Sequence, residues 1–165
     1  MIGGMTHAQL KAWIERYSDR MPYQAKDGQA SGTQNTNGNT AITVNLDTEV
    51  VENDNYTLSS NEITVAEAGV YLVSWQGTVN TAAILGTVRG SVDCWVENNS
   101  SQTGVEHLES SDYFRQAGQR VSVGGSGLAE LAADDSLRLR LALNAGVDAY
   151  PLQQHKSWIS LLKIS

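Results

Sequence analysis

The sequence predicts an all-β fold, an antiparallel sandwich, preceded by one short α-helix and an extended linker. Segments that alternate apolar and polar residues recur from residue 40 to the C-terminus, as half-buried strands do. Clusters of Asn, Asp, Gly and Ser separate these segments, and such clusters form turns between antiparallel strands. Charged residues make up only 18% of the chain, and the uncharged polar residues that replace them are typical of turn-rich β proteins.

Size, charge and cysteine content narrow the class of protein. The 165 residues, 41% of them hydrophobic, suit one domain with a core, and no run reaches the roughly 18 apolar residues of a membrane-spanning helix. The net charge of −7 predicts that neither nucleic acid nor a membrane is a partner. The single cysteine, Cys94, excludes an internal disulfide. The first ten residues lack the apolar core of a signal peptide, which predicts synthesis in a cytoplasm without secretion.

The helix is expected from Thr6 to about Arg20, within an N-terminal segment of residues 1–25. Thr6 is a suitable N-cap, and Gln9 three residues later completes a capping-box pattern. Four apolar side chains follow at the spacing of one helical face: Leu10, Trp13, Ile14 and Tyr17. A helix of this length is marginal alone in water, so the apolar stripe must pack against its own domain or against another chain.

A polar linker, residues 26–39, favours the second alternative. It contains no large apolar residue, and it separates the helix from the β domain at residues 40–165. Residues 1–26 carry four basic and two acidic side chains, a sum of +2, whereas residues 27–165 carry seven basic and sixteen acidic ones, a sum of −9. We therefore expect residues 1–38 to dock on another protein while the acidic domain faces solvent.

Seven segments carry the strand pattern. They are residues 41–46, 62–65, 69–79, 87–96, 119–123, 136–143 and 157–164. In the third segment, Tyr71, Val73 and Trp75 point to one face and the residues between them to the other. In the sixth, four leucines alternate with polar residues that include Arg138 and Arg140, which predicts a buried leucine face and an arginine face outside. Four polar clusters are expected to be turns: residues 52–55, 97–104, 124–127 and 144–148.

Three stretches of the β domain carry a family pattern. They are residues 55–74, which include the Gly69-Val70-Tyr71 motif, residues 128–137, and the final strand at residues 157–162. In order and spacing these stretches resemble the C1q/tumour-necrosis-factor superfamily. The resemblance covers residues 40–165 and implies a ten-strand jelly roll that assembles as a homotrimer. Asp134 and Ser160 stand where that family usually has Gly.

The resemblance also implies which residues lie between the copies of a trimer. Leu72 and Trp158 match family segments that face the trimer axis, and Ser74 and Ser160 lie on the same two strands. We expect these four residues at the interface. Tyr71 and Val73, on the opposite face, are expected in the core of the single chain.

The layout of the chain points to a class of function. No collagen-like Gly-X-Y repeat precedes the domain, and the tethered, single-cysteine arrangement is similar to jelly rolls that phages use in trimeric head, fibre and spike proteins. The expected function is a non-enzymatic structural protein of the virion, a capsid decoration or head-fibre protein that binds the major capsid protein through residues 1–38. The alternative is a receptor-binding module of a tail fibre or spike that recognises a host-surface glycan or protein.

The sequence shows no motif for catalysis, for a cofactor or for a metal. His7, His107 and His155 have no zinc-binding spacing, and His107 is expected in a polar loop. Residues 124–127 lack the helix and lysine of a phosphate-binding loop. We therefore predict no catalytic residue, no cofactor and no metal.

Two alternatives for small-molecule chemistry remain open. The aromatic residues are six Tyr, four Trp and one Phe, a set suited to interfaces, and Trp95 and Tyr113 are candidates for stacking on a glycan. An enzyme that cleaves cell-wall polysaccharide would need two carboxylates about 5 to 9.5 Å apart in a cleft. No motif in the sequence marks such a pair.

Overall fold

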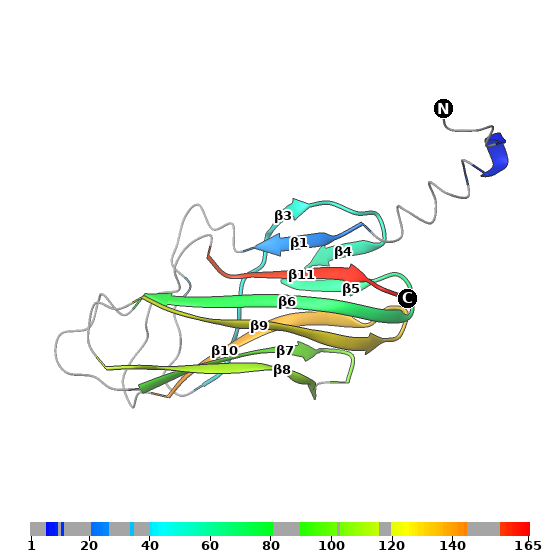
Figure 1. Cartoon of the computed structure of the whole chain (residues 1–165). Helices are drawn as coiled ribbons and strands as arrows, with labels where there is room; N and C mark the ends of the chain where they lie inside the picture. Colours follow the sequence, from blue (N-terminus) through cyan, green and yellow to red (C-terminus); the bar gives the residue numbers. More distant parts are fainter. Residues whose placement is uncertain are drawn as a thin grey trace.

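A computed structural model of the chain describes residues 6–9, 11, 21–26, 34, 40–80, 90–101, 103–115, 120–144 and 156–165. These residues form a sandwich of two antiparallel sheets, and the axes of their long strands are nearly aligned (Figure 1). The fold class predicted from the alternating segments is therefore confirmed. In the part of the chain that is described, no helix has the length and hydropathy needed to cross a membrane.

The first sheet has the strand order β3-β1-β11-β6-β9. Its strands are β3 (Thr48–Val51), β1 (Tyr23–Lys26), β11 (Trp158–Lys163), β6 (Gly69–Asn80) and β9 (Arg120–Leu131). The second sheet has the order β4-β5-β10-β7-β8, with β2 against β10. Its strands are β4 (Tyr56–Ser59), β5 (Glu62–Val65), β10 (Ser136–Asn144), β7 (Gly90–Asn98), β8 (Thr103–Phe114) and β2 (Ile42–Thr43).

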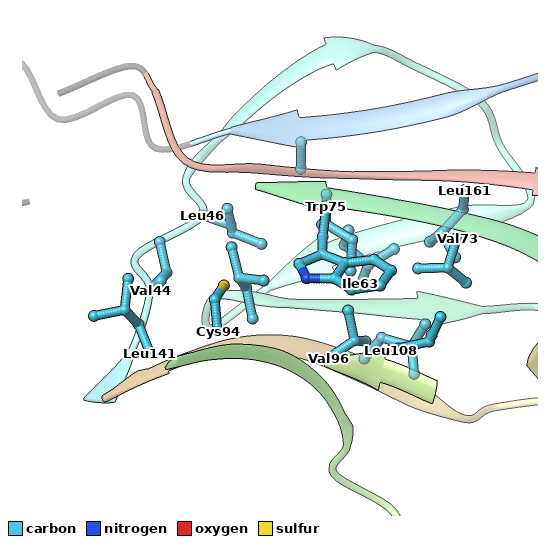
Figure 2. Close-up of a cluster of buried hydrophobic side chains, with 14 of the residues drawn as sticks. Val44, Leu46, Ile63, Val73, Trp75, Cys94, Val96, Leu108, Leu141 and Leu161 are labelled. Carbon is cyan, nitrogen blue, oxygen red and sulfur yellow. The ribbon is translucent and has the colours of Figure 1, made fainter. Parts of the chain in front are cut away.

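One apolar core lies between the two sheets (Figure 2). The alternation in the sequence correctly predicts its members from the long strands. Tyr71, Val73 and Trp75 of β6 are buried, and the four leucines of β10 have no exposed surface. Burying one such side chain contributes about 1.5–3 kcal/mol, so this layer makes a large favourable contribution to the stability of the fold.

Strand β1 lies ahead of residue 40, where the sequence analysis began the β domain. It pairs with β11 and β3 inside the first sheet, and its residues Tyr23 and Ala25 are fully buried. The Tyr23 ring stacks on Tyr56 with centroids 4.9 Å apart, and Tyr56 meets Tyr71 edge-on at 6.3 Å. The sandwich therefore includes residues from the segment expected to serve as an anchor. In the expected linker, Oε1 of Gln34 accepts a hydrogen bond from the backbone amide of Asn45 at 2.8 Å.

Residues 124–127, expected to form a turn, lie in the middle of β9 instead. Large side chains from other strands explain the glycines. A Cβ on Gly125 would lie 3.1 Å from Cη2 of Trp75, and one on Gly127 would lie 2.6 Å from Cδ2 of Leu108. Glycine in a strand often marks such a close approach.

Strand β8 was missed by the sequence analysis, which placed His107 in a polar loop. The strand lies at the edge of the second sheet, and of its twelve residues only Leu108 and Phe114 are buried among those whose side chains are described. The turn between β9 and β10 holds Asp134 with φ at 66°. Aspartate tolerates this left-handed conformation better than most residues, which explains how it can replace the glycine usual in the resembling family.

The predicted capping box at the start of the helix is confirmed. The Gln9 amide donates to Oγ1 of Thr6 at 3.3 Å, and the Thr6 amide donates to Oε1 of Gln9 at 2.9 Å. Residues 7–9 and 11 are helical. The apolar stripe expected to dock on a partner lies outside the described residues: Leu10, Trp13, Ile14 and Tyr17.

The buried thiol of Cys94 gives a prediction about stability at alkaline pH. Burial raises the pKa of Cys94 from 9.0 to about 12, so the unfolded thiol ionises first as the pH rises. The stability that the protonated thiol confers is complete below pH 9 and is lost as the pH rises toward 12, by at most about 1.4 kcal/mol per pH unit. We expect the urea midpoint of Cys94→Ala to fall less steeply between pH 9 and 11 than the urea midpoint of the wild type. Parallel curves would contradict this role, because the buried tyrosines contribute equally in both proteins.

Candidate assembly surface

The outer face of the first sheet carries an uncharged patch on β11, β6 and β9, with Lys26 of β1 beside it at one edge and Glu130 of β9 beside it at another. Alternate residues of β11, β6 and β9 point away from the core, and the strand register aligns them in three rows. We call these nine residues the uncharged face. They are Leu162, Leu72 and Leu128 in the first row, Ser160, Ser74 and Ser126 in the second, and Trp158, Gln76 and Gly124 in the third.

The side chains of the uncharged face are only partly covered in the single chain. Leu128 is 61% exposed, and Leu72, Leu162 and Trp158 are half-buried. Contiguous exposed apolar side chains mark interaction sites on soluble proteins. The centre of a protein–protein interface is also poor in charged residues, as this surface is.

The outer face of the second sheet is different in kind. Arg138 pairs with Glu97 and lies 3.8 Å from Glu62, and Nε of Arg140 lies 3.2 Å from Oε2 of Glu97. Nη1 of Arg140 also donates to Thr43 Oγ1 at 2.6 Å. These ion pairs between neighbouring strands suit a surface that remains in water. The uncharged face therefore differs from the charged outer face of the second sheet, and we predict that it is the surface that contacts a partner.

The structure brings together all four residues predicted for the trimer interface. Ser74 and Ser160 are directly opposite each other in the register of β6 and β11. Leu72 and Trp158 each lie two residues away along those strands, on the same face. Their place in an interface stays a prediction, because the structure contains one chain.

Five residues of the uncharged face were not predicted from the sequence: Leu162, Leu128, Ser126, Gln76 and Gly124. The alternation of β11 could have found Leu162, which has the same parity as Trp158. Leu128 belongs to this face only through the pairing of β9 with β6, which no local pattern reveals.

In the residues that the structure describes, no group of three or more His, Cys, Asp or Glu is arranged to hold a metal ion.

A charge placed on the uncharged face should prevent association. We expect Leu128→Arg to leave the monomer folded, because this side chain is mostly in water, and to convert the assembly to monomers, because an unpaired buried charge costs several kcal/mol. Thr57→Arg, on exposed β4 of the other sheet, is the matched control. Light scattering and circular dichroism report mass and fold. An unchanged mass for folded Leu128→Arg would show that this face is not the interface.

Comparison with solved structures finds proteins of the tumour necrosis factor type. Eiger TNF from S. frugiperda matches with a TM-score of 0.64 and 18% sequence identity, over 89% of this chain and 94% of that chain. Murine APRIL at pH 5.0 matches with a TM-score of 0.61 and 13% identity, over 88% and 99% of the two chains. Murine APRIL at pH 8.0 matches with a TM-score of 0.57 and 13% identity, over 87% and 98%. A search with family models and a search among curated proteins gave no match. The fold of this chain is therefore a TNF-like jelly roll.

Proposed function

We propose that the chain is a non-enzymatic structural protein of a phage virion, in which three copies form a jelly-roll trimer displayed on the capsid. The observation that carries the proposal is that the molecule has three parts that differ in charge and structure. The outer side of the first sheet carries the uncharged face. The outer side of the second sheet carries ion pairs, and a basic segment with a capped helix precedes the acidic domain. Each part then has one role: association, exposure to solvent, and attachment.

The uncharged face supports association into a trimer. Its three rows extend over β11, β6 and β9, and the resemblance to the C1q/tumour-necrosis-factor superfamily implies three copies around one axis. Trp158 is the largest side chain of the face. If association covers it fully, its removal costs about 3–5 kcal/mol per chain.

The N-terminal segment supports attachment to another virion protein such as the major capsid protein. The capping box fixes the start of the helix at Thr6, well ahead of β1. The apolar stripe gives a docking helix an area to bury, and three such arms in one trimer bind jointly even when each is weak. The charge of −9 over residues 27–165 keeps decorated particles apart in solution.

A position at the tail tip, as a receptor-binding module, is the second candidate. The observation that favours it is a pair of hollows beside Trp95 on the outer face of the second sheet. Labelled antibody against the chain on intact virions separates the two candidates. Label on the head supports the capsid role, and label at the tail tip supports receptor binding.

Two truncations test the anchor separately from the sandwich. Removing residues 1–20 spares β1, so we expect an unchanged melting curve and mass but no incorporation into virions, measured by mass spectrometry of purified particles. Removing residues 1–38 also deletes the buried Tyr23 and Ala25, so we expect a clearly lower melting temperature. Incorporation of the protein that lacks residues 1–20 would contradict the proposed attachment.

A further inference from the structure

Two shallow hollows flank Trp95 on the outer face of the second sheet. The first has a volume of about 340 Å³ and is lined by Asp93, Cys94, Trp95, Glu109, Ser110 and Ser111. The second has a volume of about 410 Å³ and is lined by Trp95, Gly104, Val105, His107 and Glu109. Trp95 and Glu109 line both, so the hollows adjoin across one aromatic side chain.

A bulge in β8 shapes the second hollow. Trp95 pairs with Glu109, and Glu97 pairs with Gly104, so one residue of β7 faces four residues of β8. The bulged segment contains His107 with φ at 67°, a left-handed conformation that is uncommon outside glycine. Such strain is often retained at binding sites, where a bulge redirects side chains.

The polar groups around Trp95 discriminate against anionic ligands. The carboxylates of Asp93 and Glu109 disfavour phosphate, sulfate or sialic acid in the hollows. The Arg140 guanidinium, on the residue paired with Trp95 in β10, already pairs with Glu97 and so does not offset these carboxylates. An uncharged ligand that both donates and accepts hydrogen bonds suits carboxylates, serine hydroxyls and an imidazole together.

We propose that the hollows beside Trp95 bind a neutral oligosaccharide. One sugar ring lies with its C–H face against the half-buried indole, and the neighbouring units extend into the two hollows. Their hydroxyls donate to Glu109 and Asp93 and exchange hydrogen bonds with Ser111 and His107. An aromatic platform with a few convergent polar groups is the usual composition of a site for a small polar ligand.

The proposed sugar site is independent of the uncharged face. The two surfaces belong to different sheets and point away from the core in opposite directions. The site therefore needs only the folded sandwich, and its failure would leave the proposed attachment to a virion untouched.

Tyr113 is the matched control for Trp95. It lies on β8 with 52% of its surface exposed, but it lines neither hollow. The Arg115 guanidinium lies 5.9 Å from its ring centroid, so a cation already occupies the face on which a sugar would stack. Of the two aromatic candidates from the sequence, the geometry favours Trp95 alone.

The test is a glycan array that carries neutral, sialylated and sulfated oligosaccharides, probed with the full chain. Calorimetry then measures the strongest neutral binder. We expect Trp95→Ala to weaken its affinity by about tenfold or more, Trp95→Phe to retain most of it, and Tyr113→Ala to leave it unchanged. Gly104→Leu gives a second test, because a Cβ there meets Cδ1 of Trp95 at an ordinary 3.7 Å and the longer side chain fills the hollow.

The results of these measurements either support or overturn the proposed site. Binding of a neutral oligosaccharide that Trp95→Ala and Gly104→Leu each weaken by about tenfold or more, with the circular dichroism spectrum retained, supports the site. Binding only to sialylated or sulfated glycans, or no binding by the folded wild-type chain, overturns it. An affinity that neither substitution changes also overturns it, because the sugar then lies elsewhere.

Discussion

Large side chains packed against glycines of β9 constrain the rest of this structure. The Trp75 ring fills the space over Gly125, and Leu108 fills the space over Gly127. Trp75 comes from β6, in the same sheet as β9, whereas Leu108 comes from β8, so the contact of Leu108 with Gly127 ties the first sheet to the edge of the second. Any side chain at Gly127 would have to displace Leu108, and overpacking of this kind typically costs 1–3 kcal/mol.

The hollow beside Trp95 follows from this packing. Leu108 can enter the core because β8 leaves its register with β7 between Gly104 and Glu109. The same departure opens the hollow beside Trp95. The departure from register that lets Leu108 enter the core therefore accompanies the polar hollow on the outer face of the second sheet.

The sequence was informative where the cause of structure is local. Alternation predicts β6, β10 and β11 and their buried faces, and the Thr6 capping box needs only residues three apart. The glycine run in β9 was misassigned because its partners arrive from other strands. β8 was missed because an edge strand with one face in water need not look apolar.

The candidate site shows the same division. Residues of β6 and β11 were predicted for the interface, and strand parity then places them on one face. Leu128 joins them only through the register of β9, and the Trp95 hollows depend on a bulge that has no sequence signature. Strand pairing and irregular register are long-range properties, so local patterns do not contain them.

We expect the uncharged face to be buried between copies of this chain. Sedimentation equilibrium of the full wild-type chain at micromolar concentration tests it most directly. The account predicts a single species with three times the chain mass of 17.8 kDa. A folded monomer at that concentration would contradict it.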